Sequence, residues 1–293
     1  MKIKTDKKKM FDTLKAIFFN EFSVDLTGCR SVSGGSINAA YCAFNEDKKW
    51  FIKLNSKEKY PDMFEKEHYG LTTLRQTLFD VPLSLAHGTH ENFTYLILDF
   101  IESFSKDEMN WELFGKSLAQ MHLISKPKFG LNYSNYIGSL VQQNNYHSTW
   151  EDFYTNERLL VLVELGLNKK LLSSTDVNRI ERLCIRLSEI VPTEHPGLVH
   201  GDLWRGNIMC NKNNAPVLID PALYYGHREM DIGMLHLFGS ISQVALENYQ
   251  NVYPLEKGWL ERMDVFQLYP FLVHLILFGT SYLGLVRKIA NRY

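Results

Sequence analysis

Cysteine is scarce in this sequence, and its spacing argues against zinc-binding and disulfide-rich classes. Four cysteines occur in 293 residues, and no two of them form a Cys-x-x-Cys pair. Such pairs are typical of structural zinc sites, and small secreted domains need a denser set of cysteines for a disulfide framework. The first residues also lack the apolar stretch of a secretory signal peptide. We therefore expect free thiols and a cytoplasmic protein.

The chain also lacks a strong net charge. Its 32 Lys and Arg residues are balanced by 33 Asp and Glu residues, which leaves a formal charge of −1. Proteins that bind nucleic acid or acidic membranes usually show a basic excess. The one basic cluster, at Lys2, Lys4 and Lys7 to Lys9, is interpreted as a solvated start of the chain, with a binding arm as the alternative. We expect a monomer without a nucleic-acid or membrane partner.

Long apolar runs are almost absent as well. The exception is LYPFLVHLILFGTSYLGLV, residues 268–286, which contains no Asp, Glu, Lys or Arg. The run contains His274, Thr280, Ser281 and two glycines, which favour a buried C-terminal helix. A single membrane span is the alternative.

What is present is a change of pattern near residue 100. Before it, strands are predicted at 36–44 and 49–55, joined by the polar turn 45–48, with a helix at 61–77 and a strand at 93–101. After it, helices are predicted at 110–124, 149–166 and 174–191, the last with Ser174 or Thr175 as N-cap, and again from about residue 230. This pattern predicts an α+β protein with a small sheet-rich lobe, 1–100, and a larger, mainly helical lobe, 101–293.

The stretch LVHGDLWRGNIM, residues 198–209, places polar groups inside an apolar segment. Two short apolar runs, NIMCN and PVLI, lie between Asn207 at the start of the first run and Asp220 after the second, and the turn-rich segment 212–215 separates them. This predicts a hairpin that returns Asp220 to the side of Asn207. An amide oxygen and a carboxylate suit Mg²⁺, and Asp202 just upstream suits a general base for a hydroxyl nucleophile. The spacing matches the catalytic loop and metal-binding Asp of kinases.

A kinase also needs a cation for the nucleotide phosphates. Lys53 lies in the apolar strand WFIKL, where a lysine is costly unless it is paired. On the 61–77 helix, Glu67 falls on the apolar stripe of Phe64, Leu71 and Leu74. We predict that Lys53 and Glu67 form the Lys–Glu pair of a kinase small lobe. A purely structural salt bridge is the alternative.

A phosphate cradle is expected before the Lys53 hairpin. Gly34 and Gly35 are adjacent in SVSGGSINAAY, residues 31–41, and glycines let backbone N–H groups turn toward phosphate oxygens. An ordinary turn would have the same sequence.

Four segments together resemble the fructosamine kinase (ketosamine 3-kinase) family: HGDLWRGNIM, LIDPALYYGHREMDIGMLHLFG, FIKLN and MFEKEHYGL. The resemblance covers about residues 10–290. It implies a protein-kinase-like bilobal fold, with a small antiparallel-sheet N-lobe that binds nucleotide and a helical C-lobe that binds the acceptor, near aminoglycoside phosphotransferases and choline kinases. It also implies transfer of the ATP γ-phosphate to the 3-hydroxyl of a ketosamine, free or on a protein lysine, which leads to deglycation.

The resemblance further implies a role for individual residues. Asp202 would be the base, and Asn207 and Asp220 would bind Mg²⁺. ATP would be held by the following residues: Lys53 on the α- and β-phosphates, Glu67 orienting Lys53, Gly34, Gly35 and Ser36 over the phosphates, and Asp99 and Ile101 at the adenine through their backbone. Asp231 is expected to hold the catalytic loop by accepting its backbone N–H groups.

Three further residues are candidates for substrate contact: Trp204, Arg228 and Tyr225. For each, packing or ion pairing inside the lobe is the alternative. The chain departs from the family pattern at Arg205, where relatives more often have Ser, and at Ser36 and Ile37, in a loop that carries Cys in many relatives. The sequence leaves open the role of Arg205, the preferred sugar and whether the amine is free or protein-linked. The competing functions are a kinase for an aminoglycoside or a choline-like acceptor, and a nucleotide-binding pseudokinase.

Overall fold

The computed structural model describes residues 7–32, 37–237, 239 and 241–293. The chain forms two compact units, here called the first unit (1–109 with 209–220) and the second unit (110–208 with 221–293). The expected division after residue 100 differs from these units, because the segment 209–220 packs on the first unit. There the amide of Leu218 donates to the carbonyl of Asp80 (3.0 Å), and Nδ2 of Asn211 donates to Oδ2 of Asp80 (2.6 Å).

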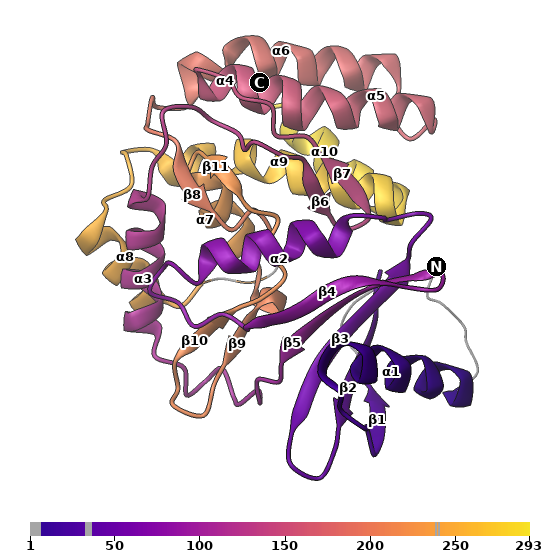
Figure 1. Cartoon of the computed structure of the whole chain (residues 1–293). Helices are drawn as coiled ribbons and strands as arrows, with labels where there is room; N and C mark the ends of the chain where they lie inside the picture. The colour runs from indigo at the N-terminus through magenta and orange to yellow at the C-terminus, as the bar shows by residue number, and fades with distance from the viewer. Residues whose placement is uncertain (1–6, 33–36, 238, 240) are drawn as a thin grey trace. The chain divides into compact units, whose positions relative to one another are not determined.

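The first unit is built on an antiparallel sheet (Figure 1). Its five strands lie in the order β1-β2-β3-β5-β4. Their bounds are β1 (Gly28–Ser31), β2 (Ala39–Phe44), β3 (Lys49–Ser56), β4 (Ser84–His90) and β5 (Phe93–Asp99). The predicted β2–β3 hairpin is confirmed, and its turn is stabilised by Oδ1 of Asn45, which accepts from the amides of Asp47 (3.0 Å) and Lys48 (2.8 Å).

The two faces of this sheet are covered by different helices of the same unit. Helix α1 (Lys7–Phe22) buries Met10, Leu14 and Phe18 against Ile52 and other residues of one face. Side chains alternate along a strand, so Lys53 points to the opposite face. That face carries α2 (Met63–Leu74), which packs against β4 and β5. Lys53 is thereby aimed at α2.

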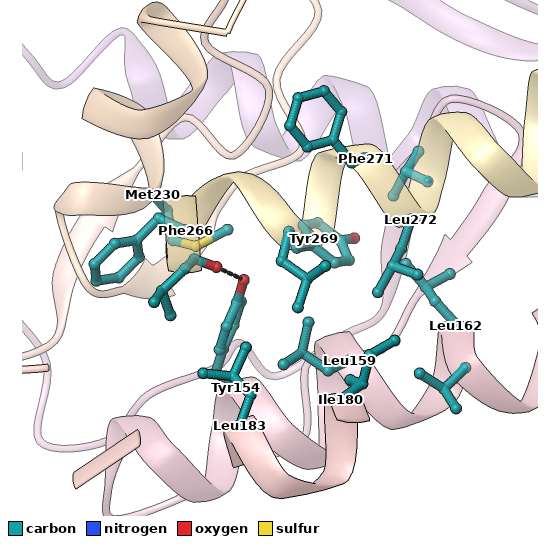
Figure 2. Packing of buried hydrophobic residues seen from close by; sticks show 14 of the residues in the cluster. Tyr154, Leu159, Leu162, Ile180, Leu183, Met230, Phe266, Tyr269, Phe271 and Leu272 are labelled. Atoms are coloured by element: carbon teal, nitrogen blue, oxygen red, sulfur yellow. Dashed lines mark hydrogen bonds between the residues drawn. The ribbon is translucent and has the colours of Figure 1, made fainter. Parts of the chain in front are cut away.

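The second unit is mainly helical, and its core is shown in Figure 2. Its helices are α3 (Trp111–Leu123), α4 (Trp150–Phe153), the π-helix η1 (Tyr154–Leu159), α5 (Leu160–Asn168), α6 (Ser174–Ile190), the 3₁₀-helix η2 (Arg205–Asn207), α7 (Glu229–Leu235), α8 (Gln243–Val252), α9 (Trp259–Phe278), the 3₁₀-helix η3 (Thr280–Tyr282) and α10 (Leu283–Ala290). The predicted N-cap of α6 was wrong. Ser173 caps this helix, because Asp176 at the third helical position completes a capping box with it.

Short two-stranded ladders complete the described fold. They pair β6 (Asn135–Ile137) with β7 (Leu140–Gln142), β8 (Gly197–Val199) with β11 (Tyr224–Gly226), and β9 (Ile208–Cys210) with β10 (Pro216–Leu218). The β9–β10 pairing confirms the hairpin predicted between Asn207 and Asp220.

The apolar run 268–286 is mostly buried up to Ile276 and more exposed beyond it, and it is not one helix. Helix α9 ends at Phe278, because Gly279 adopts φ 93°, and α10 begins only at Leu283. Most of the second half of α9 is buried, including Leu272 and Leu275, which explains why this stretch lacks charge. Among the described helices, none combines the length and apolar character that crossing a bilayer requires.

Candidate active site

In the first unit, the buried Lys53 is the centre of an ion-pair cluster with Glu67 and the more exposed Asp220. Its ammonium lies 2.6 Å from Oε1 of Glu67 and 2.5 Å from Oδ1 of Asp220. The residue is 4% exposed, so the charge is shielded from water. Burial alone lowers the pKa of Lys53, but Asp220 and Glu67 outweigh that effect and raise the pKa above its ordinary value. The predicted contact of Lys53 with Glu67 is confirmed, and the lysine is held in the charged form.

Asp220 occupies a strained backbone position. Its φ is 56°, a left-handed conformation that non-glycine residues adopt at a cost and that Asp tolerates better than most. It follows the β9–β10 hairpin, whose contacts with Asp80 hold that hairpin on the loop after α2. The same helix supplies Glu67, so one set of contacts positions both acids around Lys53.

In the second unit, Asp202 lies on a loop that is fixed by its backbone. The loop follows β8, and Asp231 accepts the amide of His200 (2.7 Å) and the amide of Gly201 (3.0 Å). Nε2 of His122 lies 3.2 Å from the same carboxylate. The role expected for Asp231, to accept the backbone N–H groups of this loop, is confirmed.

Gly201 is required by its conformation and by its neighbours. Its φ is +80°, and a Cβ atom there would lie 2.8 Å from the carbonyl carbon of Ala222 and closer still to its oxygen. Ala222 in turn donates its amide to the carbonyl of His200 (2.9 Å). The chain segment that follows Asp220 therefore packs directly on the Asp202 loop.

Asn207 is oriented by Asp202. Its Nδ2 donates to the backbone carbonyl of Asp202 (2.9 Å) and to Oδ2 of the same residue (2.9 Å). Oxygens of a carbonyl and a carboxylate only accept, so the amide orientation of Asn207 is determined by this contact. Its Oδ1 then faces away from Asp202 and accepts no hydrogen bond from the residues that the structure describes. An amide oxygen that is oriented in this way fits a ligand for a hard cation.

Comparison with known proteins now decides the family. The family model for fructosamine kinase matches residues 9–293. A probable ketoamine kinase of Enterococcus faecium is 34% identical, over 89% of this chain and 94% of that protein. A chloroplastic protein-ribulosamine 3-kinase of Oryza sativa is 34% identical, over 92% of this chain and 79% of that protein. This chain belongs to the fructosamine kinase family.

Solved structures agree with this assignment. A crystal structure assigned as a fructosamine-3-kinase from Haemophilus somnus is 26% identical, covers 96% of this chain and 97% of that one, and has a TM-score of 0.86. An aminoglycoside phosphotransferase is 14% identical over 95% of this chain, with a TM-score of 0.65, which shows a shared fold. The expected protein-kinase-like α+β fold is thus confirmed.

Among the substrate candidates of this fructosamine kinase, Arg228 has a structural role. It is 2% exposed, and its guanidinium forms a bidentate pair with Glu194 (2.7–3.1 Å). It also donates to the carbonyls of Tyr253 and Pro254 (2.8 and 2.7 Å), and it lies over the ring of Tyr253. The proposed substrate contact of Arg228 is therefore corrected: its partners lie far along the sequence, and they engage the donors that a substrate would need.

Trp204 and Tyr225 differ in accessibility. Trp204 is 36% exposed, and a Cβ atom added at Gly206 would come within 2.6 Å of its ring. The small Gly206 thus leaves room for the ring in this position. Tyr225 is buried in β11, and its backbone pairs with Gly130 (2.8 and 3.1 Å). Contact of either residue with substrate stays a prediction.

The expected nucleotide contacts of the first unit are described only in part. The amide of Asp99 donates to the carbonyl of Leu83 (3.0 Å), which removes this donor from the set available to a base. Asp99 and Ile101 line a hollow of about 650 Å³ together with Arg75 and Lys212. Their role at adenine stays a prediction. Gly34, Gly35 and Ser36 lie outside the described residues.

Two features of the fructosamine kinase were missed from the sequence. A narrow cavity adjoins Asp202 and has walls from Met230, Met234, Tyr269 and His274. Nδ1 of His274 lies 2.6 Å from the carbonyl of Pro270, and burial lowers the pKa of this imidazole. Tyr269 and His274 both belong to the apolar run 268–286. Because this run lacks charge, the sequence did not indicate that they line a cavity beside Asp202. The polar His274 within the run was the available signal.

Proposed function

We propose that this protein transfers the γ-phosphate of ATP to the 3-hydroxyl of a ketosamine, free or linked to a protein lysine. The oxygen–phosphorus bond to the sugar forms as the bond to ADP breaks, and the hydroxyl proton passes to Asp202. The observation that carries the proposal is the fixed Asp202–Asn207 pair, in a chain that also holds Lys53 charged between Glu67 and Asp220. Ketoamine and ribulosamine kinases among its relatives support the acceptor class.

Asp202 acts as the base that orients the attacking hydroxyl. Asn207 donates to its Oδ2, so one carboxylate oxygen is held and the group has a defined direction. The backbone before it is tied to Asp231. Such preorganisation reduces the entropy lost on reaching the reactive geometry. The exposed ring of Trp204 on the same loop suits a wall for the sugar.

Lys53 acts as a cation that changes partners. Without nucleotide it neutralises Glu67 and Asp220 together. With nucleotide, we expect its ammonium to move from Asp220 to the phosphates while Glu67 keeps hold of it. The carboxylate of Asp220 and Oδ1 of Asn207 are then the ligands for Mg²⁺. When bound, this ion neutralises charge on the phosphate oxygens. Gly34, Gly35 and Ser36 would cover the phosphates, and Asp99 and Ile101 would meet the base.

The setting of the reaction is part of the same proposal. We infer a monomeric cytoplasmic enzyme that needs neither nucleic acid nor a membrane. The balanced charge of the chain supports the last two of these inferences. The proposal also includes an elimination step after phosphorylation that frees the amine.

An acceptor screen tests this function. Purified protein is incubated with ATP and Mg²⁺ and, separately, ribulosyl-lysine, fructosyl-lysine, kanamycin or choline, and ADP release is followed. We expect turnover with a ketosamine, a phosphorylated product by ³¹P NMR, and free lysine afterwards. The same assay with EDTA and with Asp202→Asn should lose that turnover. Turnover with kanamycin or choline alone would replace the acceptor class, and no turnover with any acceptor would favour the pseudokinase alternative.

A further inference from the structure

Arg158 is a buried cation of the second unit without a carboxylate partner. Its side chain is 0% exposed. Nη1 donates to the carbonyls of Gln143 (2.5 Å) and Glu157 (3.0 Å), and Nη2 donates to Oδ1 of Asn144 (2.7 Å). Within the described ranges it forms no ion pair, and its Nε has no hydrogen-bond acceptor. Burial of an unpaired charge costs several kcal/mol, so the site must offer other compensation.

Aromatic rings supply that compensation. The central guanidinium carbon lies 4.1 Å from the ring centroid of Tyr224, 4.5 Å from that of Phe153 and 5.5 Å from that of Tyr269. A desolvated cation over a ring face is attracted by the negative π-face. Arg158 belongs to the π-helix η1, a geometry that is often found at functional sites. The cation thus ties η1 to rings of β11 and α9.

Two of these rings touch the Asp202 loop. Tyr224 pairs with Val199 in the β11–β8 ladder, and its ring would meet a Cβ atom at Gly201 at 3.1 Å. Tyr269 lines the narrow cavity that Gly201 and Asp202 also line. Figure 2 shows Tyr269 on α9 in the same core as Tyr154 and Leu159, the latter being the neighbour of Arg158 in sequence.

A polar path joins the same parts. The hydroxyl of Tyr269 donates to Oε1 of Gln142 (2.8 Å), and Nε2 of Gln142 donates to the carbonyl of Ala222 (3.0 Å). Ala222 is the residue against which Gly201 packs. Burial raises the pKa of Tyr224 to about 12, with the charge of Arg158 opposing the rise and Asp231 adding to it. The Tyr224 hydroxyl therefore feels the charges of both Arg158 and Asp231.

We propose that Arg158 is a positioning residue for the catalytic loop: its unpaired guanidinium holds the rings of Tyr224 and Tyr269 in place behind Gly201 and Asp202. This rests on the proposed function only in taking Asp202 as the base. Arg158 contacts no reacting atom in this role. Its loss loosens the loop and lowers the rate of the chemical step, while nucleotide binding is unaffected.

The test compares Arg158→Met, which removes the charge at similar length, with Arg158→Lys, which keeps a charge. Arg186→Met, at a half-exposed guanidinium on α6, is the control. We expect Arg158→Met to speed amide hydrogen exchange in the segment 198–209 and to lower kcat by about 10- to 100-fold, the scale for a small misplacement of a reacting group. The KM for ATP should stay within about twofold, because Arg158 takes no part in binding ATP. Arg158→Lys should recover most of both losses, and Arg186→Met should match the wild type.

Unchanged exchange and kcat in a folded Arg158→Met protein would overturn the proposal, as would an equal loss in Arg158→Lys. If Arg158→Met does not fold, Tyr269→Leu is measured in its place, with the same expectations and the same refuting result. If the wild type phosphorylates no ketosamine, the proposed function fails. The exchange measurement then still decides the role of Arg158, because it needs no acceptor.

Discussion

Replacement of Gly201 by Ala should both disable the Asp202 loop and destabilise the fold. The new Cβ would lie 2.8 Å from the carbonyl carbon of Ala222, whereas ordinary contact begins near 3.4 Å. Either the loop or residue 222 must therefore move by at least about 0.6 Å. The φ of +80° adds about 1–2 kcal/mol for a residue with a side chain, and overpacking adds about 1–3 kcal/mol. A shift of this size next to a base costs up to about 100-fold in rate.

The measurement pairs two Gly→Ala variants. Gly284, in α10, lies on an exposed face, and a Cβ atom added there would have no neighbouring atom within 4 Å. Gly284→Ala should therefore raise helix stability by up to about 1 kcal/mol and leave kcat unchanged. For Gly201→Ala we expect a loss of about 2–5 kcal/mol in urea unfolding and a fall in kcat of about 100-fold. A Gly201→Ala protein with the kcat and unfolding free energy of the wild type would refute the steric argument.

Two more predictions follow from buried charges. Lys53→Met should lower kcat/KM for ATP by about 100-fold or more, because a preorganised cation is lost, while Lys49→Met on the same strand, at a half-exposed lysine, should change it little. Burial lowers the pKa of His227 to about 4 from an ordinary 6.5, so the native state binds fewer protons than the unfolded state between these values. Stability must therefore fall as the pH drops through this window, by about 2 kcal/mol at pH 5 relative to neutral pH. Urea unfolding at both pH values should show this loss in the wild type and in His195→Gln, whose side chain is exposed, but not in His227→Gln; an equal loss in all three proteins would assign it to other groups.

Local sequence signals were sufficient where neighbours in the chain determine the structure. The β2–β3 hairpin follows from two apolar runs around Asn45, whose side chain closes the turn. The approach of Glu67 to Lys53 follows from two periods: the strand alternation points Lys53 away from Ile52, and the helical period places Glu67 on the stripe of Phe64 and Leu71. Each of these periods can be read from the sequence of a single strand or helix.

Predictions failed where contacts with distant parts of the chain determine the local structure or the role of a residue. Strand β4, SLAHGTH, has one β-branched residue and a central Gly88, so its own propensity is weak, and it is a strand because β5 pairs with it. Helix α1 was hidden by its lysines, although Leu14 and Phe18 bury one face. Arg228 lies within a motif close to the site, yet its partner Glu194 precedes it by 34 residues and determines its role.

Four residues on which the proposals depend violate local rules, and the violations share one physical reason. Gly201 and Asp220 have positive φ, and Lys53 and Arg158 are buried cations. Groups from other elements determine three of these sites: Ala222 leaves no room for a side chain at Gly201, two acids surround Lys53, and aromatic rings surround Arg158. Stability alone does not account for the buried charges, because replacing a buried ion pair with apolar residues is often neutral or stabilising. Their presence in the two parts of one proposed phosphotransfer site is therefore explained by the need for charges and a carboxylate in defined positions.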